Sequence, residues 1–245
     1  MPERRHAWVA LTMSTLAFTV CFAAWMLNGV LVTHLTVNQV FNWSASEIGW
    51  LLGIPVLTGS IFRLPAGVLT DKFGGKPVFT ALLLFCALPM FLLSQANSYW
   101  TFALCSFGFG LVGVSFSIGI AYTSVWFPKN RQGLALGIFG AGNAGSALTT
   151  LIAPTLLDRF TEHGQNVEGW RTLPVVYAIA LVAMGVLFYA ATTNKKPKSA
   201  VKTVAQQLEP LKDIRVWRFG LYYFLVFGCF VAFSQWLVPY FVNVY

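Results

Sequence analysis

The sequence predicts an all-α polytopic membrane protein, and three observations support this fold class. Hydrophobic residues fill 57% of the 245 positions and charged residues only 10%, which excludes a soluble domain of this length. Seven apolar stretches approach or exceed the roughly 20 residues that a helix needs to cross a bilayer. Basic residues gather in every second connection between these stretches, as they do in proteins that cross a membrane repeatedly.

The seven stretches are interpreted as helices. Membrane-spanning strands would be about ten residues long and would alternate in hydrophobicity, which these stretches do not. A helix also pairs its backbone N–H and C=O groups within its own segment, as the interior of a bilayer requires. In chain order the predicted spans are Trp8–Val32, Ile48–Thr70, Val78–Leu93, Tyr99–Phe127, Leu134–Leu157, Thr172–Thr193 and Phe219–Val244.

The net charge of +8 follows the predicted topology. Most lysines and arginines lie in the N-terminus, in the connections after the second and fourth spans, and in residues 194–217. The positive-inside rule therefore predicts a multi-pass protein of the cytoplasmic (inner) membrane whose N-terminus is cytoplasmic and whose surroundings are the lipid bilayer. A basic patch for nucleic acid is the weaker explanation, so we expect no nucleic-acid partner.

The chain divides at its longest polar connection. We expect an N-terminal six-helix bundle in residues 1–193 and a cytoplasmic linker in residues 194–217. Residues 218–245 are expected to form a seventh transmembrane helix that begins a second bundle. The sequence stops at Tyr245 without a polar tail. We therefore expect an N-terminal fragment whose partner is a missing C-terminal six-helix half. The alternative is a complete seven-helix protein.

Arg63 is the only charged side chain inside the seven predicted spans. An arginine near the bilayer centre costs roughly 2.5–3.5 kcal/mol on insertion scales, so it persists where it is paired or faces a cavity. No Asp or Glu in the other spans can neutralise it. A bound anion is therefore the expected partner, and the planar guanidinium suits two oxygens of a small oxyanion. The alternative is a side chain that snorkels toward the cytoplasm.

The connection after the second span reads Gly67-Val68-Leu69-Thr70-Asp71-Lys72-Phe73-Gly74-Gly75-Lys76. Its two adjacent glycines permit a short reversal with positive φ, so a generic tight turn is one interpretation. The segment also resembles the loop signature of the major facilitator superfamily, Gly-x-x-x-Asp-(Arg/Lys)-x-Gly-Arg-(Arg/Lys), apart from Gly75 in place of Arg. The resemblance implies two six-helix bundles that rock around a midplane site. It also implies that Gly67, Asp71, Lys72, Gly74 and Lys76 form a gating loop.

The fifth span is rich in glycine. Small residues four apart let membrane helices approach closely, so helix packing is expected at Gly133, Gly137, Gly140 and Gly145. Asn143 differs, because an amide in apolar surroundings needs partners. The stretch from Gly140 to Ser146 resembles the nitrate signature of the nitrate/nitrite porters, Gly-x-Gly-Asn-x-Gly-Gly, apart from Ser146 in place of Gly. This resemblance implies that Gly142 and Asn143 contact the substrate.

Four further positions follow from the same resemblance. Members of that family bind the anion with an arginine on the second helix and with aromatic residues, which carries over to Arg63, Phe116, Tyr223 and Phe227. The positive edge of a ring can face an anion, and a tyrosine hydroxyl can donate a hydrogen bond. Ordinary packing is the alternative for the three aromatic residues, since aromatics make up 16% of the chain.

The two resemblances together imply a major facilitator porter for nitrate and/or nitrite that works by alternating access, and not an enzyme. A proton relay would need an intramembrane Asp, Glu or His, but His6, His34 and His163 lie outside the predicted spans, so we expect a nitrate/nitrite antiporter. No grouping of residues suggests a metal or another cofactor. The alternatives are a porter for another small anion, such as a carboxylate, and a half-length membrane sensor or scaffold that does not transport.

Overall fold

The computed structural model describes residues 2–196, 206 and 209–244, and these residues are predominantly helical. Seven helical segments among them are long and apolar enough to span a membrane, which confirms the predicted fold class. They are Arg4–Val37, Ala45–Phe73, Gly75–Leu93, Tyr99–Trp126, Lys129–Phe160, Val167–Ala191 and Ile214–Leu237.

Several spans are built from more than one helix. The elements in chain order are α1 Pro2–Trp25, α2 Leu27–Val37, α3 Ala45–Ile61, α4 Arg63–Phe73, α5 Gly75–Leu93, α6 Tyr99–Gly110, η1 Leu111–Val114, α7 Ser115–Trp126, α8 Lys129–Gly140, η2 Ala141–Ala144, α9 Gly145–Phe160, η3 Val167–Arg171, α10 Thr172–Ala191, η4 Glu209–Lys212 and α12 Ile214–Val244. The short 3-10 segments η1 and η2 interrupt the fourth and fifth spans, where glycine is frequent.

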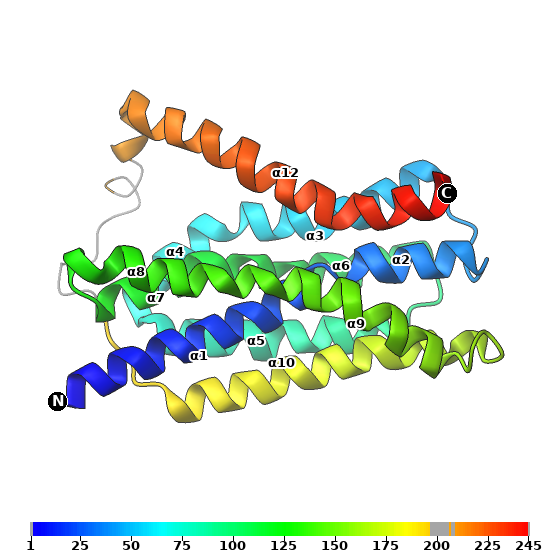
Figure 1. Ribbon diagram of the computed structural model, residues 1–245, viewed down its shortest axis with the longest axis horizontal. Coiled ribbons are helices and arrows are strands. Elements are labelled where there is room, and N and C mark those ends of the chain that lie inside the picture. Colours follow the sequence, from blue (N-terminus) through cyan, green and yellow to red (C-terminus); the bar gives the residue numbers. More distant parts are fainter. Residues whose placement is uncertain (1, 197–205, 207–208, 245) are drawn as a thin grey trace.

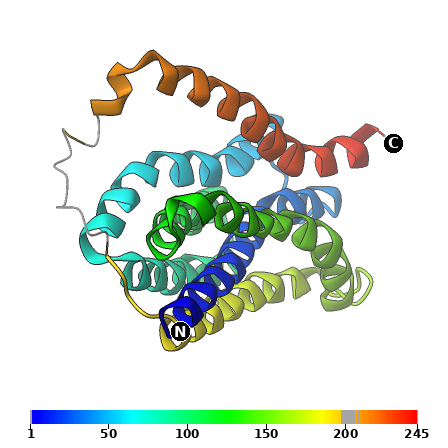
Figure 2. The same cartoon turned by 60° about the vertical axis from the view of Figure 1, so that its left-hand side comes forward.

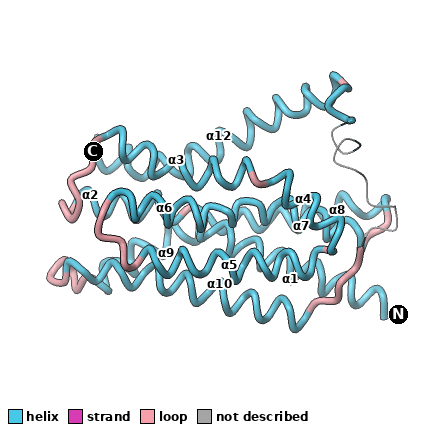
Figure 3. The backbone as a smooth tube through the Cα atoms, turned by 180° about the vertical axis from the view of Figure 1, so that it is seen from behind, coloured by secondary structure: helices cyan, strands magenta, loops and turns pink. Residues whose placement is uncertain are grey.

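The first six spans lie side by side in one bundle, and α12 lies along its edge (Figure 1). Helix α1 packs against α7, α8, α9 and α10, so it occupies the centre of the bundle. Figure 2 shows that α12 approaches the bundle toward its C-terminal end, whereas the end that begins at Ile214 stands apart. Figure 3, seen from behind, places the longer loops at the two ends of the bundle.

The helices extend beyond most of the apolar stretches that predicted them. The first span continues to Val37, so His34 lies on the membrane-length segment Arg4–Val37, and so does His6. The expectation that both lie outside the spans is wrong. Apolar length marks only the hydrocarbon core, and helical hydrogen bonding continues into the interfacial region. The ends are fixed by local capping, as Ser44 shows by accepting the backbone N–H of Glu47 at the start of α3.

The second span breaks at Phe62, and this break positions Arg63 as the first residue of α4. Pro65 follows two residues later and has no N–H group, so it cannot continue the helical hydrogen bonding to Ile61. The chain turns at this point, and α4 runs in a new direction from α3 (Figure 1). The helix break thus places Arg63, the only arginine of this span, at the start of α4.

Several chain segments meet at the end of the bundle that holds the N-terminus. The Nδ1 atom of His6 lies 3.1 Å from Oγ1 of Thr193, and the hydroxyl of Tyr122 donates to the Thr193 carbonyl at 2.6 Å. Asn194 donates to the carbonyl of Phe73 at 3.0 Å. The N-terminus, the end of α4 and the segment after α10 therefore share one side of the membrane. That this side is the cytoplasm remains a prediction from charge.

Candidate functional site

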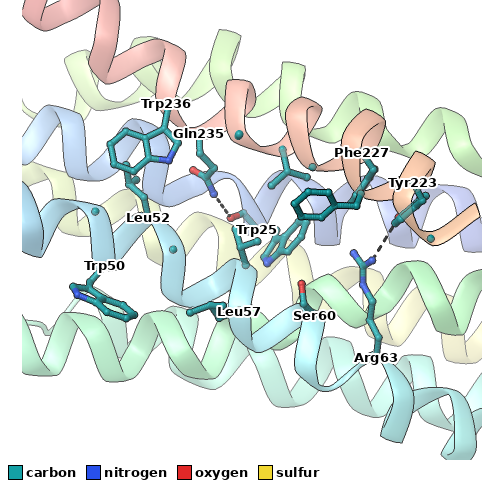
Figure 4. Close-up of a pocket in the computed structure, with 18 of the residues that line it drawn as sticks. Trp25, Trp50, Leu52, Leu57, Ser60, Arg63, Tyr223, Phe227, Gln235 and Trp236 are labelled. Atoms are coloured by element: carbon teal, nitrogen blue, oxygen red, sulfur yellow. Dashed lines mark hydrogen bonds between the residues drawn. The ribbon is translucent and has the colours of Figure 1, made fainter. Parts of the chain in front are cut away.

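A cavity of about 770 Å³ lies between α3, α4 and α12. Figure 4 shows Arg63 at one end of it and Trp236 toward the other. Most of its lining is apolar, and Arg63 is the one charged residue among the lining residues that the structure describes. The lining residues are Trp25, Ser46, Gly49, Trp50, Leu52, Gly53, Val56, Leu57, Ser60, Arg63, Gly220, Tyr223, Phe224, Phe227, Gly228, Val231, Ala232, Gln235 and Trp236.

The Arg63 guanidinium points across the cavity at the seventh helix (Figure 4). Its Nη1 donates to the hydroxyl of Tyr223 at 3.5 Å, which is a long hydrogen bond. Its Cζ atom lies 5.8 Å from the ring centroid of Phe116 and 5.5 Å from that of Phe227. These distances fit cation–π contacts. The side chain therefore engages α12 and α7 instead of snorkelling toward the Asp71 end of α4.

Arg63 has few polar partners for a half-buried guanidinium. Its Nε atom is buried and has no hydrogen-bond partner among the residues that the structure describes. Within that part of the chain the two ion pairs are His163 with Asp158 and Arg171 with Glu168, and neither involves Arg63. Buried hydrogen-bonding groups are normally satisfied, so the free donors of Arg63 are available to a ligand with acceptor oxygens.

The three aromatic residues named from the sequence come together around Arg63. The rings of Tyr223 and Phe227 stack at a centroid distance of 4.9 Å, one turn apart on α12. Phe116 of α7 lies 6.2 Å from Tyr223 and 5.9 Å from Phe227, in near-parallel orientation. The rings form an apolar wall beside the guanidinium, and apolar surroundings strengthen an electrostatic attraction for an anion.

This arrangement can bind an anion but offers little other chemistry. The guanidinium supplies parallel donors, the Tyr223 hydroxyl a further donor, and the rings a low-dielectric wall. Among the cavity-lining residues that are described there is no Asp, Glu or His to act as a general base. In the described part of the chain no three His, Cys, Asp or Glu side chains lie close enough together to hold a metal ion.

Asn143 and Gly142 lie on η2 and are not among the residues that line this cavity. Asn143 Nδ2 donates to the Gly140 carbonyl at 2.8 Å, and its Oδ1 is buried without a partner among the described residues. A Cβ atom on Gly142 would lie 2.5 Å from the ring of Phe18, so this glycine allows η2 to pack closely on α1. Substrate contact by both residues stays a prediction.

The glycines expected at packing positions fall into two groups. A side chain at Gly145 would collide with the backbone of Thr19 on α1, so the helices touch there. Around Gly133, Gly137 and Gly140, by contrast, a Cβ atom would meet nothing within 4 Å. Among the described residues, no neighbouring helix therefore packs closely against these three glycines. Their role in helix packing stays a prediction.

The loop between α4 and α5 is a tight reversal. Gly74 ends α4 with φ at +91°, which only glycine adopts easily, and the amide of Asn194 packs against it. Lys72 lies over the ring of Phe73 at 5.3 Å and Lys76 over that of Tyr189 at 4.3 Å. The other two residues of the motif, Gly67 and Asp71, make no such contacts among the described residues. A Cβ atom on Gly67 would touch nothing within 4 Å, and in the described regions no hydrogen bond or ion pair holds Asp71.

Most of the cavity-lining residues were not identified from the sequence, and three of them are notable. Trp25 lies in the middle of a span, away from the interfacial position typical of tryptophan. Ser60 precedes Arg63 by three residues and lies on the other side of the break at Phe62, yet both line the cavity. Gln235 is an amide within the seventh apolar stretch, and that polarity was the available signal.

Known proteins resemble the chain over nearly its whole length. It is 44% identical over 99% of its residues to the "Probable nitrate/nitrite antiporter NarK1" of Thermus thermophilus and covers 56% of that protein. It is 32% identical over 99% of its residues to the "Nitrite extrusion protein" of Bacillus subtilis and 34% identical over 95% to the "Probable nitrate transporter NarT" of Staphylococcus epidermidis, covering 58% of each. The chain thus spans about half the length of the curated relatives it matches.

A solved structure has the same fold at low sequence identity. It is the crystal structure of a bacterial homolog of the human lysosomal transporter Spinster, with a TM-score of 0.68 at 16% identity. The match covers 85% of this chain and 47% of that one. Residues 13–245 also match the family described as the Major Facilitator Superfamily. The chain is therefore a member of the major facilitator superfamily, a family of multi-pass membrane transporters, and it is related to nitrate/nitrite transporters.

Proposed function

We propose that this chain is part of a secondary transporter that moves nitrate and/or nitrite across the cytoplasmic membrane by alternating access. The observation that carries the proposal is Arg63, a guanidinium in an apolar cavity with one long hydrogen bond to Tyr223 and no acidic partner among the described residues. The printed names of the three relatives point to the same anions. A planar donor fork suits a planar or bent oxyanion.

The proposed mechanism is exchange of nitrate for nitrite. The described lining of the Arg63 cavity carries no carboxylate or imidazole, so a proton has no side-chain carrier beside the anion. An anion of the same charge leaving on the return step keeps the fixed charge of Arg63 compensated. His34 lies on α2 and hydrogen-bonds within its own helix end, to Asn38 at 3.3 Å, and does not line the cavity.

The loop between α4 and α5 is proposed to gate this transport. Asp71, without a partner in the described regions, is available to an element of the second half, which fits the gating role that the loop signature implies. We also propose that the N-terminus and this loop face the cytoplasm, in line with the concentration of basic residues at that end.

A transport assay tests exchange against proton symport. The protein expressed from its complete reading frame is reconstituted in liposomes, and uptake of labelled nitrate is followed with nitrite, nitrate or no anion inside. We expect uptake that requires an internal anion and is indifferent to an imposed pH gradient. Uptake driven by a pH gradient into anion-free liposomes would contradict exchange.

The same assay tests the runner-up, a porter for another small anion such as a carboxylate. Acetate and formate are added outside in excess over labelled nitrate, with chloride as the control for ionic strength. We expect nitrite to compete strongly and the carboxylates weakly. Stronger competition by a carboxylate than by nitrite would favour the runner-up. Nitrate binding with no uptake under any gradient would favour a sensor.

A further inference from the structure

A second polar side chain lies in the same cavity as Arg63. Gln235 of α12 is only 2% exposed, although α12 as a whole is the least buried of the seven spans. An amide buried among apolar side chains is unfavourable unless its hydrogen bonds are made. Polar side chains that bond across membrane helices act as specific contacts between them. Gln235 therefore marks a defined contact of the seventh helix with the six-helix bundle.

The partner of Gln235 is a backbone carbonyl released by a helix break. Helix α1 ends at Trp25, and the N–H of Gly29 donates to Met26 at 3.2 Å instead of to Trp25. The carbonyl of Trp25 is thereby free for an outside donor, and Nε2 of Gln235 donates to it at 3.3 Å. The break between α1 and α2 thus creates an acceptor at the surface where α12 docks.

Gly29 provides the space for this contact. A Cβ atom at that position would lie 2.8 Å from Oε1 of Gln235 and 3.3 Å from its backbone oxygen. A Cβ atom at Gly29 would therefore displace the Gln235 amide and press on the backbone of α12. The glycine and the free carbonyl lie four residues apart on the chain and act on the same glutamine.

The contact extends from Trp25 to the helix that carries Arg63. The indole Nε1 of Trp25 donates to the carbonyl of Pro55 at 2.8 Å, and Asn28 donates to the carbonyl of Leu51 at 2.8 Å. Proline has no N–H group, so Pro55 leaves the Leu51 carbonyl without its helical donor, and Asn28 supplies one. Arg63 follows Pro55 by about two helical turns. Gln235 is thereby linked through Trp25 to α3.

The two ends of α12 differ in how they meet the bundle. Ile214 and Trp217 at its beginning are 64% and 61% exposed, whereas Val231 near Gln235 is 6% exposed. Figure 4 shows Gln235 reaching toward Trp25 beyond Phe227, farther along α12 from Tyr223 and Arg63. Helix α12 therefore meets the bundle at a contact near Gln235 and stands apart from it at its beginning.

The Gln235 contact is only half satisfied. Its Oε1 is buried without a partner among the residues described, and its one hydrogen bond is longer than those of Trp25 and Asn28 within the bundle. In an open cavity both ends of the amide would reach water. A contact that leaves Oε1 unsatisfied is therefore weaker than one in which both ends of the amide are bonded.

We propose that Gln235 is a positioning residue that closes the anion pathway on the side where α2 ends, by docking α12 onto the Trp25 carbonyl and Gly29. The inference rests on the proposed function, since a closure of this cavity matters only if an anion crosses the membrane through it. When α12 leaves Gly29, the hydrogen bond breaks and the cavity opens on that side.

The test measures access to the cavity from each side of the membrane. In the protein from the complete reading frame, Cys105 and Cys229 are replaced by alanine and Ser60→Cys is the reporter. Its alkylation by a membrane-impermeant maleimide is timed in spheroplasts and in inverted vesicles. The readout is the rate from the side where α2 ends divided by the rate from the other side.

Gln235→Met keeps the length of the side chain and removes the donor. A cross-helix hydrogen bond in a membrane protein contributes enough that its loss should raise the ratio roughly 3- to 18-fold. Gly29→Ala should raise it too, and decides the question if Gln235→Met does not fold. Ser234→Ala, a neighbouring substitution on α12, is the control and should leave the ratio within about twofold, below the smallest change expected for the hydrogen bond. An unchanged ratio in Gln235→Met or in Gly29→Ala would overturn the proposal.

The labelling readout needs no nitrate, so the two proposals fail separately. If the wild type takes up no nitrate but Gln235→Met shifts the ratio, the closure stands and the substrate is wrong. If nitrate is exchanged and both variants leave the ratio unchanged, the substrate stands and the closure is wrong.

Discussion

Arg63 and Arg171 carry the same side chain in opposite surroundings. Arg171 donates to the carbonyls of Ser94 and Ala96 at 2.8 and 3.0 Å, and to Asn97 at 2.7 Å. It also pairs with Glu168 and lies 4.7 Å from the centre of the neighbouring tryptophan ring. Arg63 has one hydrogen bond of 3.5 Å and two phenylalanine rings.

The difference separates a structural arginine from one that we propose binds a ligand. Arg171 joins η3 to the end of α5, and its donors are used within the fold. Arg63 has unused donors in a cavity, where a buried unsatisfied group is unfavourable until something binds it. The comparison therefore predicts that changes at Arg63 affect anion binding and changes at Arg171 affect stability, and four substitutions probe this division.

The largest effect is expected from Arg63→Gln, which removes the charge and the donor fork. A hydrogen bond to a charged group contributes about 1.5–3 kcal/mol, and Arg63 can offer two, so nitrate affinity should fall about 100-fold or more. The melting temperature without nitrate should stay the same or rise, because an unpaired charge leaves the membrane interior. A large drop in melting temperature with unchanged affinity would reverse the roles of the two arginines.

Arg171→Gln should have the complementary effect. The loss of its hydrogen bonds to α5 should lower stability by about 1–3 kcal/mol, which corresponds to a melting temperature lower by roughly 5 °C. Thermal unfolding in detergent measures this, and the nitrate affinity of the folded fraction should not change. Reduced affinity in protein that is fully folded would show that Arg171 also acts on the site.

Tyr223→Phe removes the hydroxyl that, among the described residues, accepts a hydrogen bond from Arg63. A hydrogen bond to a charged group contributes about 1.5–3 kcal/mol, so nitrate affinity should fall roughly tenfold or more while the aromatic wall remains. Tyr222→Phe is the matched control, because the adjacent Tyr222 is 60% exposed and does not line the cavity. Equal effects from both substitutions would remove Tyr223 from the site.

The smallest effect is expected from Asn143→Ala. One N–H of the amide donates to Gly140, its free Oδ1 is an acceptor that cannot bond to an anion directly, and Asn143 does not line the Arg63 cavity. Nitrate affinity should therefore change by less than about twofold, below the smallest contribution of one neutral hydrogen bond. A loss as large as that of Arg63→Gln would mean that Asn143 turns toward the anion in the bound state.

Much of the fold follows from the apolar stretches of the sequence, because a bilayer fixes the length of a helix that crosses it. The helix ends were predicted less accurately, because helical hydrogen bonding continues past the apolar core. His34, for example, lies on the first helical span and not beyond it. The break at Phe62 depends on Pro65, whose effect on direction is set by the neighbouring helices. These features are decided by tertiary contacts that local composition does not contain.

The centre of the site could be anticipated and its outer part could not. A lone intramembrane arginine implies a ligand on energetic grounds, and the structure places Phe116, Tyr223 and Phe227 around it. Gln235 is a polar residue in an apolar stretch, but its partner is a backbone carbonyl freed by a helix break, which the sequence does not reveal. Gly133 and Gly137 show the opposite case. Their spacing predicts close helix packing, but among the described residues nothing packs against them.

The central claim is that the free donors of Arg63 bind an oxyanion, and equilibrium binding of nitrate to Arg63→Lys tests it most directly. Lysine keeps the charge and loses the planar fork. Titration calorimetry on the protein from its complete reading frame should show nitrate affinity at least about tenfold weaker. Arg159→Lys, the same substitution at an exposed arginine, should bind nitrate as the wild type does. Unchanged nitrate affinity in Arg63→Lys would contradict the account.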